Sequence, residues 1–279
     1  MAIRDDGFIV GSVSGGCVEG AVQETALKCL QSGEATLLKF DSLSNDDVWR
    51  IGLSCGGSIH VWVDPNPVER DPTFWSRLVD AVRREEPCAL ITYFDPVSQV
   101  LAPTDGMATH ALEDEIGFVQ VLGPLDELII VGAVHIAIPL TALAKMMGFR
   151  VLLIDPRSNL VTAERFPSVP DEFRTQWPAE ALADLELNEN TYAVVLTHDP
   201  KIDDAALEVF LRSKVRYIGA LGSRKTQEKR RADLADLGFS AFDLARIHGP
   251  IGLSIGAQSP EEIALSIMAQ IISVRHAPH

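Results

Sequence analysis

The chain has 279 residues, 47% hydrophobic and 23% charged, which is enough apolar material for two globular domains with separate cores. Its formal net charge of −15 disfavours general binding to nucleic acid or to anionic membrane surfaces. The longest apolar run, residues 128–144, is interrupted by Gly132 and Pro139 and is too short for a membrane span, and no signal peptide is evident.

The first motif in the chain is a glycine-rich turn that ends in a cysteine. An apolar run at residues 8–10 predicts a short strand, and it is followed by Gly15, Gly16 and Cys17. Apolar side chains at helical spacing in residues 18–30 predict a helix directly after the cysteine. Cys17 is therefore expected at a helix N-terminus, where free backbone N–H groups and the helix dipole stabilise a thiolate.

A second cysteine is also flanked by two glycines, in the sequence Cys55-Gly56-Gly57. Two such loops in one small domain favour metal or sulfur chemistry, although small buried side chains in tight turns are the alternative interpretation. Cys29 and Cys88 lie in apolar patterns and are expected in the core. The four cysteines form no C-x-x-C pair, so a reducing cytoplasmic location is expected.

The rest of the first half predicts strands at residues 58–64 and 88–94, a helix at 74–82 and a weak strand at 97–101. Residues 104–122 are acidic and loosely patterned, and they are interpreted as an interdomain region. The domain division that follows is residues 1–117 and residues 125–279.

The second half alternates apolar strands and helical patterns. Strands are predicted at residues 128–131, 150–155, 191–196 and 215–219. Repeated βαβ units with apolar strands indicate a parallel, doubly wound sheet of Rossmann type. The fold class is therefore α/β, with an N-terminal α/β module before a Rossmann-like domain.

Two features near the end of the chain concern loop and helix geometry. The glycines and proline of residues 247–257 predict either a tight turn at the sheet or a pocket lining. Ser259, Pro260 and Glu262 form a capping-box signal for a final helix, which we expect to pack on the sheet.

The first turn of the second domain departs from a dinucleotide fingerprint. After Gly132, the second glycine position holds Val134, and only the third position, Ala137, is permissive. Asp155 stands where a ribose-binding acid would lie, and His135 faces the same crevice or packs near the helix start. An altered nucleotide pocket is favoured over ordinary NAD binding.

Two further polar motifs follow predicted strands, where open sheets bind ligands. One contains His198 and Asp199, and the other contains Gly222, Ser223 and Arg224. Residues 222–231 carry five cationic side chains and one glutamate, a net charge of +4 at a predicted helix start. Phosphate binding is the preferred interpretation, and a solvated face paired with carboxylates is the alternative.

Taken together, these motifs resemble the XdhC/CoxI family, the maturation factors of xanthine dehydrogenase and carbon monoxide dehydrogenase. The resemblance covers nearly the whole chain. It is carried by Gly11–Gly20, Cys55–Gly57, Gly132–Ala137, Asp155–Arg157, Thr197–Asp199, Tyr217–Arg224 and Pro250–Ala257.

The resemblance implies a chaperone that binds the molybdenum cofactor, protects it, supports its sulfuration and delivers it to an apo molybdenum hydroxylase. Cys17 and Cys55 would then contact molybdenum or relay sulfur. Ser223, Arg224 and the Gly132 turn would hold the phosphate of molybdopterin, with or without a cytosine nucleotide. The resemblance also implies a homodimer and a cysteine desulfurase as a partner, without turnover of a metabolite.

One departure and two alternatives accompany this resemblance. Family members usually carry a further strand and helix before the glycine–cysteine motif, so the first module is expected to be truncated, with an exposed sheet edge. An NAD(P)-dependent oxidoreductase and a redox or nucleotide sensor are the alternative functions.

Overall fold

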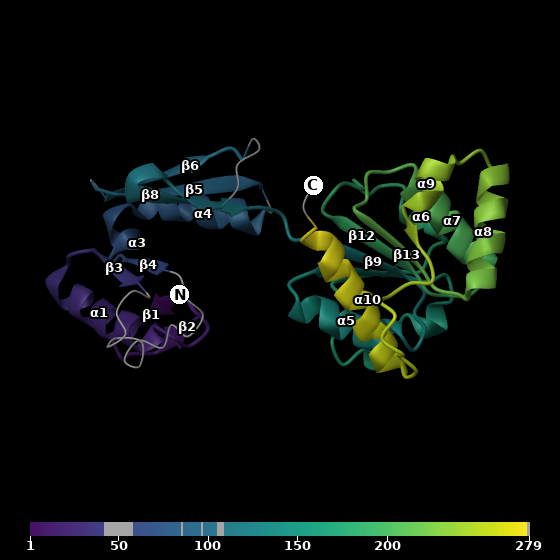
Figure 1. Cartoon of the computed structure of the whole chain (residues 1–279), viewed down its shortest axis with the longest axis horizontal. Coiled ribbons are helices and arrows are strands. Elements are labelled where there is room, and N and C mark those ends of the chain that lie inside the picture. Colours follow the sequence, from purple (N-terminus) through teal and green to yellow (C-terminus); the bar gives the residue numbers. More distant parts are fainter. Residues whose placement is uncertain (42–57, 85, 96, 105–108, 278–279) are drawn as a thin grey trace. The chain divides into compact units, whose positions relative to one another are not determined.

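A computed structural model describes residues 1–41, 58–84, 86–95, 97–104 and 109–277 of the chain. The chain forms two compact units, Met1–Gly123 and Pro124–His279. Figure 1 shows antiparallel strands and short helices in the first unit, and a central sheet with helices on both faces in the second. No described helix is both long and apolar enough to cross a bilayer.

The first part of unit 1 contains one helix and two small antiparallel strand pairs. Its elements are β1 (Ala2–Ile3), β2 (Ile9–Val10), α1 (Glu19–Ser32), β3 (Thr36–Asp41) and β4 (Ser58–Val63). β1 pairs with β2, and β3 pairs with β4. The helix packs its buried side chains Val22, Ala26 and Cys29 against Phe40, Val61 and Val63. Gly33 ends the helix in the left-handed conformation, as its sequence position predicts.

The second part of unit 1 is a four-stranded antiparallel sheet in the order β6-β5-β8-β7. Its elements are α3 (Pro67–Arg70), α4 (Pro72–Arg83), β5 (Cys88–Phe94), β6 (Val97–Ala102), β7 (His110–Ala111), a 3-10 turn (Glu113–Glu115) and β8 (Gly117–Leu122). α4 buries Phe74 and Leu78 against Cys88 and Leu90, so Cys88 is a core residue.

The interpretation of residues 104–122 as an interdomain region is wrong from His110 onward, because β7 and β8 both belong to the sheet of unit 1. β8 (Gly117–Leu122) pairs with β5 along its whole length and lies in the middle of the sheet. The acidic residues that obscured this strand lie before it, in the Glu113–Glu115 turn.

Unit 2 contains the predicted parallel sheet, with six strands in the order β11-β10-β9-β12-β13-β14. The strands are β9 (Glu127–Val131), β10 (Arg150–Ile154), β11 (Glu172–Arg174), β12 (Thr191–Val195), β13 (Tyr217–Ala220) and β14 (Ile247–His248). Every pairing is parallel. This is the Rossmann strand order. β10 and β11 lie on one side of β9, and β12, β13 and β14 lie on its other side.

Helices cover both faces of this sheet (Figure 1). They are α5 (Ala137–Met146), α6 (Pro178–Ala181), α7 (Pro200–Leu211), α8 (Arg224–Asp236), α9 (Ala241–Ala245) and α10 (Pro260–Arg275). α5 and α10 pack together on one face around Leu140 and Ile267. α6 to α9 cover the other face, where Phe210 and Leu234 are buried.

The last helix begins as its sequence predicts. Ser259 Oγ accepts a hydrogen bond from the backbone N–H of Glu262, and the Glu262 carboxylate accepts one from the backbone N–H of Ser259. The preceding loop is tight because its glycines meet neighbouring elements. A Cβ atom at Gly252 would lie 2.4 Å from Ser266 Oγ, and one at Gly249 would lie 2.5 Å from Gln227. This loop therefore turns tightly against α8 and α10.

Candidate functional site

The carboxyl ends of the parallel strands bring most of the predicted site residues to one edge of unit 2. Gly132 and His135 lie in the turn after β9, and Asp155 follows β10. His198 and Asp199 lie in the turn after β12, and Gly222 to Arg224 follow β13. β9 and β12 are neighbours, and their connections run in opposite directions, so a crevice is expected between their ends.

Gly132 lets the first turn pass close to β12. Its φ is +113°, and a Cβ atom there would lie 2.7 Å from Thr197 Cγ2 and 3.1 Å from the Thr197 backbone nitrogen. The glycine thus serves the contact between two adjacent strand ends. His135 is exposed in the same turn, before the first residue of α5.

Asp155 is fully buried and its carboxylate is occupied by the protein itself. Oδ2 accepts hydrogen bonds from the Ala133 backbone N–H (2.8 Å) and from Arg157 Nη2 (2.7 Å). Oδ1 accepts from Arg157 Nε (2.8 Å) and from the Arg157 backbone N–H (3.0 Å). Burial opposes ionisation, but these hydrogen bonds outweigh it and lower the pKa of Asp155. The carboxylate that would accept ribose hydroxyls in a dinucleotide site is therefore closed to solvent.

The turn after β12 exposes a histidine in a strained backbone conformation. His198 has a φ of +64°, which non-glycine residues rarely adopt, and it is exposed. Asp199 is the N-cap of α7, where its Oδ1 accepts from the Lys201 backbone N–H. Thr197 Oγ1 accepts from the Asp199 backbone N–H and donates to the buried Asp203. Strain of this kind often marks functional positions.

The turn after β13 leads into α8. Gly222 has a φ of +134° and lies close to Thr226 and Gln227. Ser223 caps α8 by accepting from the Thr226 backbone N–H at 3.2 Å, as predicted. Arg224 is exposed, and no hydrogen bond or ion pair is found for it within the described residues.

The cationic run on α8 is only partly a solvent-facing surface. Arg230 is buried and pairs with Asp203 and Asp204, which corrects its interpretation as part of a phosphate-binding patch. Arg224, Lys225 and Lys229 are exposed and remain available for an anion.

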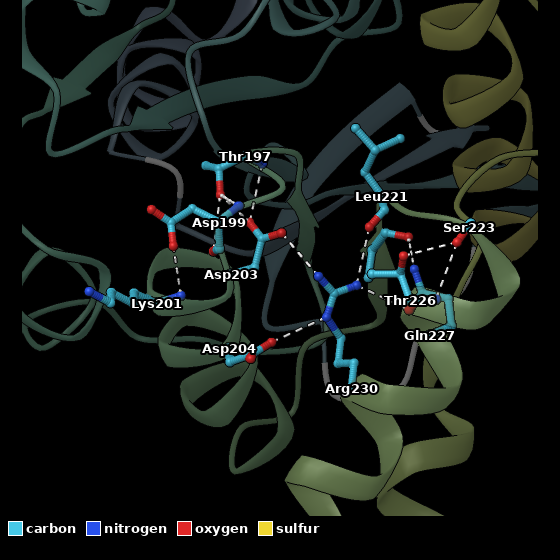
Figure 2. Close-up of polar contacts among 11 residues, drawn as sticks. Thr197, Asp199, Lys201, Asp203, Asp204, Leu221, Ser223, Thr226, Gln227 and Arg230 are labelled. Atoms are coloured by element: carbon cyan, nitrogen blue, oxygen red, sulfur yellow. Dashed lines mark hydrogen bonds and ion pairs between the residues drawn. The ribbon is translucent and has the colours of Figure 1, made fainter.

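Arg230 lies at the centre of a polar network that joins the turns after β12 and β13 (Figure 2). Its Nη2 donates to Asp203 Oδ2 (3.0 Å), while Asp203 Oδ1 accepts from Thr197 Oγ1 (2.7 Å). Its Nη1 donates to the Leu221 carbonyl and to Gln227 Oε1, both at 3.1 Å. Gln227 in turn donates to the Ala220 carbonyl. One buried guanidinium thus fixes the turns after β12 and β13 relative to each other.

In unit 1, the predicted glycine–cysteine motif forms an ordered loop before α1. Cys17 is exposed, and Gly15 and Gly16 have φ values of +77° and +117°. The Glu19 carboxylate lies inside the loop and accepts hydrogen bonds from four backbone N–H groups and two hydroxyls: Val13 N, Ser14 N, Gly16 N and Val18 N, and Ser12 Oγ and Ser14 Oγ. These contacts, led by those of Ser12 and Ser14, hold the pKa of Glu19 well below its usual range.

Glu19 should control the order of this loop. The change Glu19→Gln removes the charge and one acceptor oxygen, and we expect the loop amides to exchange with solvent about tenfold faster. Hydrogen exchange measured by mass spectrometry tests this, with Glu24→Gln on the exposed face of α1 as the matched control. Equal exchange in the wild type and Glu19→Gln would contradict the role of Glu19.

The same loop gives a pH expectation. Because the pKa of Glu19 is lowered, its contribution is present above the ordinary value of 4.5 and is lost only as the pH falls through the lower folded-state value. Loop protection in the wild type should therefore persist when the pH is lowered from 7 to 4.5.

The second cysteine motif, Cys55, Gly56 and Gly57, lies outside the described residues. Within the described ranges, no group of three or more His, Cys, Asp or Glu side chains has an arrangement that could hold a metal ion.

Sequence reasoning missed three polar roles. Glu19 was visible only as an acidic residue after the glycines, and Arg157 only as part of a family motif. Arg165, from the 3-10 turn Ala163–Arg165, donates to the Ala133 carbonyl at 2.9 Å. For the buried position of Arg230, the sequence did contain a signal. The adjacent acidic residues Asp203 and Asp204 on α7 offer partners for one cation of α8.

Comparison with known proteins agrees with this architecture. A model of the XdhC Rossmann domain matches residues 128–271, which is more than half of the chain. The chain belongs to the XdhC family. A second model, of the XdhC and CoxI family, matches residues 1–41 and includes the Cys17 loop. The predicted family is thereby confirmed.

Three relatives match nearly the whole chain. A probable xanthine dehydrogenase subunit of Bacillus subtilis is 28% identical, with 99% of this chain and 87% of that protein covered. The molybdenum cofactor insertion chaperone PaoD of Escherichia coli is also 28% identical, with 99% and 77% covered. A crystal structure from Bacillus halodurans, described as a xanthine dehydrogenase, is 28% identical with a TM-score of 0.81, and 98% of this chain and 84% of that chain are covered.

Proposed function

We propose that this chain is a molybdenum cofactor chaperone that binds the cofactor as cargo, protects it, supports its sulfuration and delivers it to a xanthine dehydrogenase or carbon monoxide dehydrogenase type hydroxylase. The observation that carries the proposal is the exposed thiol of Cys17 on an ordered loop, in a chain of the XdhC family. The similarity to PaoD supports the same role.

Each unit, taken by itself, offers donor groups of a kind that such a cargo can use. A thiolate is a soft ligand suited to molybdenum or to relaying sulfur, and Cys17 offers one, with Cys55 as a second candidate. The phosphate of the pterin, with or without a cytosine nucleotide, suits the hydroxyl of Ser223 and the exposed cation of Arg224. Gly132, His135, His198 and Gly222 belong to the same carboxyl edge of the sheet.

The closed carboxylate of Asp155 counts against the NAD-dependent form of the alternative oxidoreductase. An ordinary NAD site uses that acid to accept the ribose hydroxyls. Here its oxygens accept four hydrogen bonds from Ala133 and Arg157. A thermal-shift titration with NADH and NADPH separates the two functions, since a tight ligand of the native state must raise the melting temperature.

The remaining parts of the proposal concern partners. The apo hydroxylase receives the cargo, and a cysteine desulfurase would provide the sulfur. We propose that the chaperone acts in the cytoplasm as a homodimer. Co-purification with the hydroxylase tests the first point, and sedimentation of the purified chain tests the homodimer.

Removing the Cys17 thiol should reduce cargo retention. The change Cys17→Ala is expected to lower the molybdopterin that co-purifies with the protein about tenfold or more, because loss of even an outer contact to a metal costs that much. The measurement is the fluorescence of the oxidised pterin per mole of protein.

Cys29→Ala is the matched control, because Cys29 is a buried thiol on the core face of α1. It should leave retention unchanged in protein that remains folded. Wild-type retention in Cys17→Ala, together with wild-type activation of the hydroxylase, would show that Cys17 does not contact the cargo.

A further inference from the structure

We propose that Arg157, held in place by Asp155, is the residue that makes this edge of the sheet select a phosphate group over a ribose. The proposal rests on the proposed function in one respect: both take the carboxyl edge of the sheet in unit 2 as the ligand site. The ligand class it assigns is a phosphate ester or phosphoanhydride, in which recognition goes through the phosphate oxygens.

The Asp155–Arg157 pair has a geometry that fixes the guanidinium. Arg157 Nε and Nη2 donate to the two carboxylate oxygens at 2.8 Å and 2.7 Å, so the guanidinium is held by one edge. The hydrogen bond to Asp155 raises the pKa of Arg157, and the group remains charged. Because two atoms of the guanidinium are held, its orientation is fixed before any ligand arrives.

The other edge of this guanidinium is open. The Arg157 side chain is 40% exposed, whereas that of Asp155 is 0% exposed. Nη1 makes no hydrogen bond within the described residues, and it belongs to the edge that faces away from Asp155. A fixed guanidinium with free N–H donors is the group that best recognises phosphate oxygens.

The pair also lies beside the first turn of unit 2. Asp155 accepts from the Ala133 backbone N–H, and Arg165 donates to the Ala133 carbonyl at 2.9 Å. Two guanidinium groups therefore lie beside the turn that follows β9, where this fold binds phosphates. The carboxylates of Asp199 and Asp203 also raise the pKa of Arg157 by charge attraction.

The consequence is a reversal of the usual chemistry at the end of β10. An aspartate with free oxygens accepts hydroxyl protons from a ribose, whereas the paired aspartate presents a cation that donates to an anion. The mismatch at Val134, which weakens a dinucleotide fingerprint, no longer matters if the phosphate is bound by side chains.

The test is a calorimetric titration of the full chain with inorganic pyrophosphate. Arg157→Gln should weaken binding about tenfold or more, because it removes a charge-assisted donor pair. The matched control is Arg150→Gln at the opposite end of β10, whose side chain is 41% exposed and paired with Glu127 and Glu172. The control should bind pyrophosphate like the wild type.

A second titration, with ADP, distinguishes a nucleotide from a phosphate without a nucleoside. Since the Asp155 carboxylate is closed, ADP should bind within about threefold of pyrophosphate, because no pair of ribose hydrogen bonds is gained. ADP binding tenfold or more tighter would overturn the selection of phosphate over ribose, as would wild-type pyrophosphate affinity in Arg157→Gln or no binding of pyrophosphate to the wild type.

If Arg157→Gln does not fold, Arg157→Lys decides the matter. Lysine keeps the charge but cannot hold Asp155 with two parallel donors. An affinity loss of about threefold or more is therefore expected for pyrophosphate, and wild-type affinity would overturn the proposal.

Molybdopterin retention is measured in parallel. Pyrophosphate binding through Arg157 without molybdopterin retention would refute the proposed function alone, and retention that is independent of Arg157 would refute this inference alone.

Discussion

Replacing Arg230 with methionine should lower the free energy of unfolding by about 3–5 kcal/mol, because Asp203 is left as a buried charge without its cation. The Arg230 side chain is 5% exposed and that of Asp203 is 0% exposed, so water cannot replace the missing partner. The Leu221 carbonyl and Gln227 Oε1 lose a donor at the same time. Urea unfolding followed by circular dichroism measures the change.

Arg212→Met on α7 is the matched control for this prediction. Its pair with Glu208 is exposed, so its loss should cost less than about 1 kcal/mol. Burial raises the pKa of Asp203, and protonation at acid pH would relieve the uncompensated charge. The deficit of Arg230→Met should therefore be smaller at pH 5 than at pH 8. A loss as small as that of Arg212→Met would show that the network does not hold the two turns.

Gly132→Ala should cost about 2–4 kcal/mol, from a left-handed backbone conformation and from overpacking together. The new methyl group would meet Thr197 Cγ2 at 2.7 Å and the Thr197 backbone nitrogen at 3.1 Å, and that backbone belongs to the turn that carries His198. Thermal unfolding measures the cost.

Gly148→Ala separates the two contributions to the Gly132 effect. Its φ is +80°, but a Cβ atom there would meet nothing within 4 Å. It should therefore show only the conformational cost of about 1 kcal/mol. Equal losses for the two substitutions would mean that the contact between the turns after β9 and β12 is not tight.

The sequence carried most of the fold of unit 2 because its central strands are continuous apolar runs between helices with clear start signals. β9 and β12 lie in the middle of the sheet, are buried on both faces and were readily predicted. β11 and β14 were missed because they are edge strands of three and two residues with polar members such as Glu172 and His248. Such short edges have little periodicity to detect.

The site was only partly predictable, for a reason that Asp155 and Arg230 illustrate. The spacing along the chain placed Asp155 at a strand end correctly, but whether its oxygens are free depends on how Arg157 folds back on it. In the same way, the charge of residues 222–231 did not reveal that Arg230 turns inward to Asp203. Partner choice among charged side chains depends on tertiary packing, which periodicity does not encode.

Glu19 has a consequence for how quickly a cargo could be exchanged. Because the loop beside Cys17 is already folded around an internal carboxylate, an arriving ligand need not immobilise it. Association then loses little conformational entropy, and departure is not delayed by loop reopening. Rapid capture combined with rapid release is what the proposed carrier role requires, in contrast to an enzyme that retains a prosthetic group permanently.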